Sequence, residues 1–359
     1  MTAVTRRLLE LGMIREVETT PSRGGRPAVL LGLVGTAARA VGVKVAADHL
    51  TIVGVRLDGE VLGETTQPFD AAHPDALARL ADALSPFCAD TSGAPPLLGV
   101  GVGIPGVVAD PEVGSVDAPI LQWSSKPVGA ELRSRLGQPV IVENDVNAVA
   151  VAERLYGNGR DLDCFLVVTI GSGVGSALVQ DGVVFRGARG AAGEFGHVPV
   201  SVDGPLCRCG RRGCLEAMIG SAALVESARA AGAIEAGQGL EILTARAEAG
   251  LEAARDVFAQ AGETLGRAIA VLANVLDPRQ VLILGEGTSA WSLWEGTFLR
   301  TAEAHLTGRL AFTVDPWDDS RWAQGAAALV LAAPFDSRGT GGRESEKVLA
   351  KLAGEGRST

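Results

Sequence analysis

Three cysteines crowd into eight residues of this 359-residue chain, and a histidine lies ten residues upstream of the first. Three thiolates and one imidazole can close a tetrahedral site around Zn²⁺ in which the protein fills every position, so the metal is structural rather than catalytic. The alternative is a disulfide with spare thiols, but a Cys-x-Cys disulfide is strained and the chain shows no export signal. The spacing therefore predicts one zinc site. Its ligands would be His197, Cys207, Cys209 and Cys214.

Charged side chains surround this predicted site. Glu194 precedes the histidine by three residues, and Glu216 follows the last cysteine by two. A bound metal would anchor both carboxylates on one rigid loop, although either of them alone is typical of a surface residue. Three arginines of the loop would offset the net negative charge that three thiolates leave on Zn²⁺. These arginines are Arg208, Arg211 and Arg212.

A run of polar residues, Glu143-Asn144-Asp145, follows an apolar stretch that predicts a buried strand and precedes a helical pattern. At a strand end such side chains could hold the hydroxyls of a polyol, and a carboxylate could act as a general base. They could also form an Asx cap at the start of the helix, which is a common use of these residue types. The residues alone leave the two interpretations equal.

The strands that would position these residues follow a pattern that occurs twice. A strand, a tight turn, a second strand and an Asp-Gly hairpin return after 123 residues. This repetition indicates a duplicated α/β lobe. Two such lobes facing a cleft describe the two-lobed actin-like ATPase (ribonuclease H-like) fold, in which the two tight turns grip the phosphates of ATP. The predicted strands are 40–47, 50–57, 164–170 and 176–180, with hairpins at Asp58-Gly59 and Asp181-Gly182.

Further periodic segments complete the two lobes. Strands are predicted at 97–104, 140–142 and 281–284, and helices at 74–87, 147–156, 251–276 and 323–331. The Gly-rich run 99–106 lies along a strand and is poor evidence for a phosphate loop, and Gly106 could admit a ligand or simply turn the chain. The predicted domains are a partial winged-helix segment (1–35), a first lobe (36–150, with 320–335 returning to it), a second lobe with the zinc loop (151–319) and a polar, mobile tail (336–359).

The charge is uneven along the chain. The whole sequence carries −10, whereas residues 1–27 hold five Arg and three Glu, which gives +2 there and −12 for the remainder. An acidic body excludes a protein that coats nucleic acid along its whole length, but a small basic head could contact DNA at one end. Charge alone favours a solvated basic terminus. Since no export signal or membrane-crossing apolar run is evident, a cytoplasmic protein is expected.

The basic head has the pattern of half a DNA-binding domain. A helix is predicted at 2–11, followed by two strands at 13–17 and 27–33 that are joined by a polar loop. A helix followed by a two-stranded wing is the second half of a winged helix. The helices that should come before it are missing from the sequence, so we expect either an upstream start or a truncated form.

Four motifs, in this order and spacing, resemble those of the ROK family (repressors, open reading frames, kinases). They are Gly-Ile-Pro-Gly at 103–106, Glu-Asn-Asp at 143–145, Gly-Ala-Ala-Gly-Glu-Phe-Gly-His at 190–197 and Cys-Arg-Cys-Gly-Arg-Arg-Gly-Cys-Leu-Glu at 207–216. The resemblance covers roughly residues 1–335. It implies a sugar ligand, with one nitrogen of the histidine on zinc and the other on the sugar. The implied sugar-binding residues are Gly106, Asn144, Asp145, Glu194, His197 and Glu216.

The first tight turn departs from the pattern of the family's kinases. Those kinases carry Asp-x-Gly-Gly-Thr-Lys there, for phosphates and magnesium, whereas this chain has Lys44-Val45-Ala46-Ala47-Asp48-His49. Lys44 reverses the charge at the metal position, and Ala46 and Ala47 replace glycines that let backbone N–H groups approach phosphate. Asp145, the general base in the kinases, would then be vestigial. We therefore predict no enzyme activity, with an ATP-dependent sugar kinase as the alternative.

The start of the chain instead resembles the family's repressors. Helix 2–11 resembles their recognition helix, and residues 23–27 resemble their wing, where Arg can enter the minor groove. The candidate DNA contacts are Thr2, Thr5, Arg6, Arg23 and Arg26. We expect a sugar-responsive transcriptional regulator, a repressor, that binds sugar between its lobes and thereby changes its affinity for operator DNA. A homodimer or a dimer of dimers is expected, and a sugar sensor without DNA binding is the remaining alternative.

Overall fold

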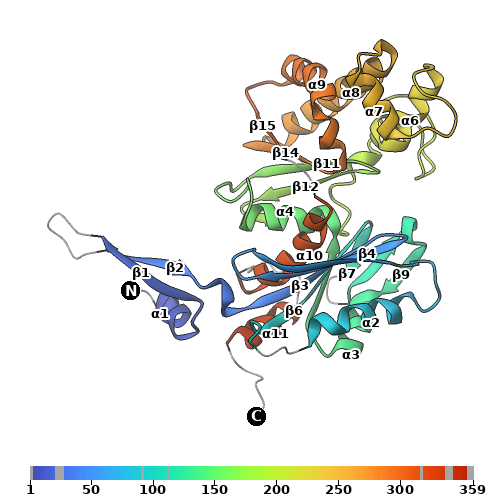
Figure 1. Cartoon of the computed structure of the whole chain (residues 1–359). Helices are drawn as coiled ribbons and strands as arrows, with labels where there is room; N and C mark the ends of the chain where they lie inside the picture. Colours follow the sequence, from blue (N-terminus) through green and yellow to red (C-terminus); the bar gives the residue numbers. More distant parts are fainter. Residues whose placement is uncertain are drawn as a thin grey trace. The chain divides into compact units, whose positions relative to one another are not determined.

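A computed structural model of the chain describes residues 3–20, 28–89, 93–110, 113–315, 318–335 and 343–353 (Figure 1). The chain divides into two compact units. The first comprises residues 1–160, 187–191 and 319–359, and the second comprises residues 161–186 and 192–318. The segment 320–335, which was expected to return to the first lobe, lies in the first unit.

A five-stranded sheet forms the centre of the first unit, in the order β10-β6-β3-β4-β5. Strands β3 (Arg39–Val45), β4 (His49–Arg56) and β5 (Val61–Pro68) form an antiparallel meander. Strands β6 (Leu97–Ile104) and β10 (Val140–Asn144) continue the sheet in parallel on the other side of β3. All residues of β6 are buried, which is typical of a central strand covered by helices on both faces.

Helices cover the two faces of this sheet. Helices α2 (Ala76–Cys88) and α3 (Val128–Leu136) contribute to one buried cluster, together with Val41, Val43 and Val45 of β3. Helices α4 (Asp145–Leu155) and α10 (Ser320–Ala332) contribute to the other, together with Ala40 of β3. The alternation along β3 is that of a strand with both faces in the core.

Glycines explain how α10 lies so close to the sheet. A Cβ atom on Gly42 of β3 would overlap the backbone of Ala323, and one on Gly101 of β6 would overlap the carbonyl group of Ala326. The Gly-rich strand β6 is therefore a packing surface for a helix. This agrees with the expectation that the run 99–106 is not a phosphate loop.

A second, smaller sheet in the first unit was not predicted from the sequence. Strands β7 (Val107–Asp110), β8 (Ser115–Ala118) and β9 (Trp123–Pro127) form it in that order. The strands are short and β9 is mostly exposed, so neither length nor apolar alternation marks them. A Cβ atom on Gly106 would meet the carbonyl oxygen of Asp117 at 2.5 Å, so this glycine lets the chain turn against β8.

The sheet of the second unit repeats the topology of the first. Its order is β13-β12-β11-β14-β15, with an antiparallel meander followed by two strands parallel to β11. The duplicated α/β lobe expected from the sequence is thus present in the strand topology. The strands are β11 (Phe165–Ile170), β12 (Val174–Gln180), β13 (Val183–Val184), β14 (Gln280–Leu284) and β15 (Ala311–Val314).

A long helix, α8 (Glu252–Leu276), organises the core of the second unit. It packs along α9 (Trp291–His305), where Phe258 and Trp294 meet edge to face with ring centroids 6.0 Å apart. Both residues are buried. The remaining helices are α5 (Leu215–Ile219), α6 (Ser221–Ala230) and α7 (Leu240–Glu248).

The start of the chain forms a helix and a two-stranded ribbon, which belong to the first unit. Helix α1 (Ala3–Glu10) is followed by β1 (Ile14–Thr20) and β2 (Ala28–Leu33), which pair antiparallel (Figure 1). This is the order of elements expected for the second half of a winged helix. Residues 21–27, the predicted wing loop, lie outside the described residues.

Two expected domain limits differ from the structure. The limit at residue 150 would cut through α4, whereas the first unit runs to Arg160. The tail 336–359, expected to be mobile because it is polar, contains helix α11 (Arg343–Leu352). Val348 of this helix is fully buried in the cluster that also holds Met13 and Ile141. One apolar side chain per turn suffices to dock an otherwise polar helix, and composition alone hides this.

Candidate functional site

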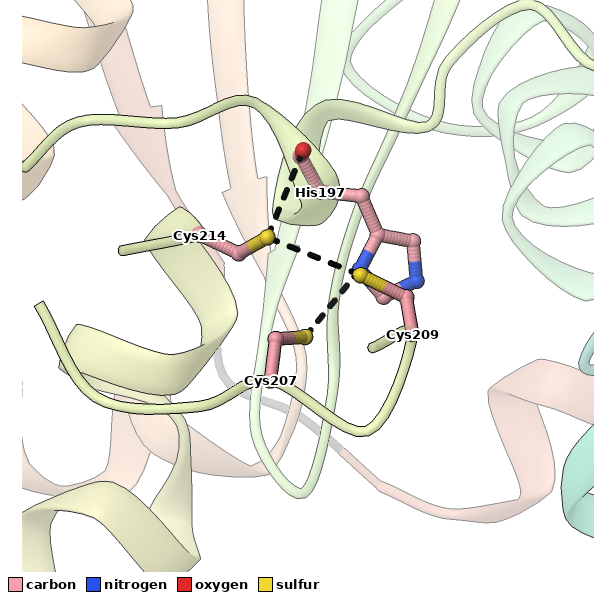
Figure 2. Close-up of side chains that lie close together, drawn as sticks. All are labelled: His197, Cys207, Cys209 and Cys214. Atoms are coloured by element: carbon pink, nitrogen blue, oxygen red, sulfur yellow. Dashed lines mark hydrogen bonds between the residues drawn. The ribbon is translucent and has the colours of Figure 1, made fainter. Parts of the chain in front are cut away.

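The four predicted zinc ligands lie together in the second unit. Figure 2 shows the His197 ring and the three cysteine sulfurs converging on one point, and their ligand atoms all lie within 4.8 Å of one another. His197 comes from a short 3-10 turn, Phe195–His197, and Cys214 immediately precedes α5. Loop glycines make this approach possible, since Gly210 and Gly213 have φ of 85° and 68°.

The spacing of these atoms fits a tetrahedral metal. Cys207 Sγ lies 3.5 Å from His197 Nδ1, and Cys209 Sγ lies 3.6 Å from Cys214 Sγ. Zinc bonds of about 2.3 Å to sulfur and about 2.0–2.1 Å to nitrogen give tetrahedral edges of about 3.5 Å for S···N and about 3.8 Å for S···S. The donor set and both measured edges therefore match what Zn²⁺ requires. All five cysteines are free thiols, so the disulfide alternative finds no support.

Neighbouring groups set the state of the thiols. Hydrogen bonds from the backbone and side chain of Arg211 lower the pKa of the Cys209 thiol to about 6. Burial raises the pKa of the Cys214 thiol to about 12. Arg211 thus favours a thiolate in the cluster, and a bound cation would favour the ionised form of the buried thiol as well.

Arg208, which was expected to offset the charge of the cysteine thiolates, instead pairs with a carboxylate. Its Nε lies 2.7 Å from Glu216 Oε1, and a second guanidinium nitrogen lies 2.8 Å from Oε2, so the two side chains form a bidentate pair. Oε2 also accepts the backbone N–H of Val174 at 3.1 Å. Glu216 thereby ties the cysteine loop to the tight turn between β11 and β12. The sequence offered no signal for this pair, because it depends on how the loop folds.

The histidine presents its two ring nitrogens to different partners. Nδ1 faces Cys207, whereas Nε2 lies 3.8 Å from Glu194 Oε2. The double role on zinc and sugar that the sequence resemblance implied for His197 stays a prediction. Glu194 is exposed, with its side chain 45% accessible, so it is available to a ligand.

In the first unit, Asp145 is held by a lysine. Its Oδ2 lies 2.9 Å from Lys44 Nζ, and its Oδ1 accepts a hydrogen bond from the backbone N–H of Val146 at 3.0 Å. Lys44 Nζ also lies 3.8 Å from the ring centroid of Trp322, a cation–π contact. The residue that departs from the kinase pattern therefore contacts the family's base directly. Neither this pair nor Trp322 was anticipated from the sequence.

Asn144 occupies the cap position of α4. Its Oδ1 accepts the N–H groups of Val146 and Asn147, at 2.9 and 3.1 Å, and its Nδ2 donates to Gly106 O at 3.1 Å. The cap interpretation thus holds for Asn144, and its role as a sugar ligand stays a prediction. The hydrogen bond to Gly106 joins two of the predicted sugar-binding positions. Buried Glu143 accepts from the Asn144 N–H at 2.8 Å and supports this turn.

The two tight turns expected to grip ATP differ from phosphate-binding turns. In the first, the Ala47 and Asp48 carbonyl groups accept N–H groups from Ala71 and Phe69, so the turn is packed against its own unit. In the second, the Glu286 carboxylate lies against Gly171, where a Cβ atom would overlap it. A carboxylate there repels phosphate.

The candidate DNA contacts are only partly within the described residues. Thr5 is half-buried and Arg6 is exposed on α1. Thr2, Arg23 and Arg26 fall outside the described residues. Among the helices that the structure describes, none combines the length and hydropathy needed to cross a lipid bilayer.

Comparison with known proteins gives a consistent result. A family model described as ROK matches residues 40–333. NagC of Escherichia coli K12, named a DNA-binding transcriptional dual regulator, is 29% identical over 308 residues, which cover 81% of this chain and 74% of that protein. A xylose repressor of Caldicellulosiruptor bescii is 28% identical, covering 78% and 74%. A glucokinase of Thermotoga maritima is 34% identical over a shorter span, 51% of this chain and 58% of that enzyme.

Solved structures confirm the fold. A ROK family transcriptional regulator, described as a homologue of the E. coli Mlc protein, superposes with a TM-score of 0.80 at 28% identity, covering 98% of this chain and 90% of that one. A Streptomyces griseus glucokinase, solved with glucose and AMPPNP, gives a TM-score of 0.69 at 26% identity, covering 81% and 98%. The predicted actin-like ATPase-type α/β fold is therefore correct.

Proposed function

This chain belongs to the ROK family, and on that premise we propose that it is a sugar-responsive transcriptional repressor and not a sugar kinase. Its relatives include NagC, xylose repressors and a regulator structure that covers 98% of the chain. The glucokinase structure covers 81%. The helix and ribbon at residues 3–33 lie before the residue where the family model begins, and they suit a DNA-contacting segment.

The observation that carries the choice between repressor and kinase is the Lys44–Asp145 ion pair. A kinase base must be able to take a proton from the sugar hydroxyl. Here an ammonium group 2.9 Å away holds the carboxylate, in surroundings where both side chains are largely buried. Ala46, Ala47 and Glu286 add to this, since each disfavours bound phosphate.

Each unit carries candidate sugar-binding groups. Asp145 in the first unit, and Glu194 and Glu216 in the second, offer carboxylate oxygens that suit sugar hydroxyls. Relatives are named for N-acetylglucosamine and xylose, and a glucokinase is solved with glucose. These three sugars are the natural first probes for this chain.

Zinc would be a resident metal, held by His197, Cys207, Cys209 and Cys214. When bound it supplies no reactive position, because four protein ligands close its coordination. It would fix the loop that carries Arg208 and so hold Glu216 in place. The protein's own charges are arranged for this, with Arg211 beside Cys209.

Sugar binding would change the affinity for operator DNA, with α1 as the contacting helix and a homodimer or dimer of dimers as the binding form. Linkage requires the effect to be reciprocal, so that sugar alters DNA affinity by the same factor as DNA alters sugar affinity. The alternatives are a kinase and a sugar sensor without DNA binding.

Selection of bound fragments from sheared genomic DNA tests the proposal. We expect specific fragments to be retained, and their retention to change with one of the three sugars. Binding of a sugar with no specific retention of DNA would identify a sensor without DNA binding. Sugar-dependent ATP consumption would identify a kinase.

A further inference from the structure

Lys44 reaches Asp145 across an intervening strand. Lys44 lies on β3 and Asp145 follows β10, and β6 separates these two strands. The residue of β6 paired with Lys44 is Gly103, and Gly103 is also paired with Glu143 of β10. A Cβ atom on Gly103 would lie 3.6 Å from Ala326 Cβ and 3.7 Å from Asp145 Cα, so this glycine lies directly against Asp145 and helix α10.

Two contacts fix the position of the lysine's ammonium group. The Asp145 carboxylate lies 2.9 Å away, and the Trp322 ring centroid lies 3.8 Å away. Trp322 comes from α10, the helix that Gly42 and Gly101 allow to approach the sheet. The Lys44 side chain is 15% accessible and that of Asp145 is 9%, so the pair is mostly shielded from water but not sealed from it.

We propose that Lys44 is a positioning and specificity-determining residue for the sugar ligand, an inference that rests on the proposed function. Lys44 and the Val146 N–H each bind one oxygen of Asp145, so the carboxylate has one orientation before the ligand arrives. Each oxygen keeps a lone pair for a sugar hydroxyl. The ammonium group has three N–H donors and presents one beside that carboxylate. The pair would therefore recognise two adjacent sugar hydroxyls, one that donates to Asp145 and one that accepts from Lys44.

This arrangement also explains how a kinase fold becomes a sensor. Transfer of a proton from a sugar hydroxyl to Asp145 would leave the ammonium group facing a neutral acid, which costs the ion pair. The ion pair thus favours Asp145 as a hydrogen-bond acceptor for a sugar hydroxyl. Preorganisation of this kind raises affinity, since less order is lost on binding.

Calorimetric titration with N-acetylglucosamine, D-xylose and D-glucose tests the inference. We expect Lys44→Met to weaken binding of whichever sugar the parent binds by about tenfold or more, because a charge-assisted donor is lost. Lys44→Arg should retain part of the affinity. Lys126→Met, which removes one positive charge from β9 of the same unit, serves as the control and should bind as the parent does. Lys44→Gln replaces Lys44→Met if the latter does not fold.

A double-mutant cycle distinguishes positioning from a general structural role. If Lys44 positions Asp145, Lys44→Met should weaken binding less in the Asp145→Asn background than in the parent, because only the direct hydrogen bond from the ammonium group then remains to be lost. Losses that add up, or a Lys44→Met protein that binds as tightly as the parent, would overturn the inference and leave the proposed function standing. A folded parent that binds none of the three sugars would count against the proposed sugar response, and the inference would fall with it.

Discussion

Two carboxylates that we propose as sugar ligands are each paired with a cation of the protein itself. Lys44 binds Asp145 in the first unit, and Arg208 binds Glu216 in the second. The charge of each carboxylate is therefore balanced within its own unit by a side chain.

The first prediction at the residue scale concerns the cysteine cluster. Cys209→Ser should lower the zinc content from one ion per chain to well below one, because an alcohol is a far poorer ligand than a thiolate. The loop 197–216 should then become sensitive to proteases while the rest of the unit stays folded. Metal analysis and limited proteolysis check this. Cys164→Ser, a thiol outside the cluster, should keep its zinc, and a zinc-free parent protein would contradict the assignment.

The second prediction at the residue scale concerns Asp145. Asp145→Asn should weaken sugar binding about ten- to a hundredfold, since the loss of a charge-assisted hydrogen bond costs about 1.5–3 kcal/mol. It should also lower the free energy of unfolding by about 1–3 kcal/mol, because Lys44 keeps its charge in a mostly buried position without its partner. Calorimetry and chemical denaturation measure the two effects. Asp82→Asn, an exposed carboxylate on α2, is the control, and equal behaviour of the two variants would refute the role.

At the scale of elements, the close contact of helix α10 with the glycines of strands β3 and β6 determines the core packing of the first unit. Gly101→Ala should destabilise the protein by about 1–3 kcal/mol, because the added methyl group overlaps the Ala326 carbonyl in a closely packed core. Gly63→Ala on β5, where nothing lies within 4 Å, should be neutral or stabilise by about 0.4–1 kcal/mol. Denaturant unfolding of the two variants measures the difference in their stability. Equal midpoints would mean that α10 is not packed as described.

Helix α11 is the second element with a measurable consequence. Val348 is fully buried, and Glu344, 4% exposed, accepts the Val140 N–H at 3.3 Å and lies 3.6 Å from Arg133 Nε. Val348→Ala should cost about 1–3 kcal/mol through lost burial. Its neighbour Leu349 is 50% exposed, so Leu349→Ala should stay within about 0.5 kcal/mol. A Val348→Ala protein as stable as the parent would restore the expectation of a mobile tail.

The sequence predicted those elements whose periodicity is strong. The long helix α8 and the buried strand β6 were placed within a residue of their observed bounds, because their apolar patterns persist over many residues. Strands β7 to β9 and helix α11 were not predicted, because they are short and bury few side chains. The zinc ligands could be read from spacing, since they are close in the chain. The Lys44–Asp145 pair, 101 residues apart, could not.

On the scale of the whole molecule, each unit has kept the topology of an ATP-binding lobe and changed the residues that would bind phosphate. The two sheets share one strand order, and both tight turns are present. In the first unit the turn has alanines and packs on its own unit, and in the second unit Glu286 lies against the turn. In both units, therefore, the residues at the tight turn support the proposal that this chain does not transfer phosphate from ATP.

The last prediction follows from these two changes. The protein should show no sugar-dependent ATP turnover with N-acetylglucosamine, D-xylose or D-glucose, whereas kinases work at about 1–100 per second. Restoring one unit should not rescue activity, because Lys44→Asp repairs the charge in the first unit and leaves Glu286 in the second. A coupled assay for ADP release measures this, with the Streptomyces griseus glucokinase as a positive control on glucose. Lys44→Asp combined with Ala46→Gly, Ala47→Gly and Glu286→Gly is the variant in which weak turnover would first be expected. Turnover by the unmodified chain at kinase rates would mean that the Lys44–Asp145 pair opens when substrates bind, and the protein would then be an enzyme.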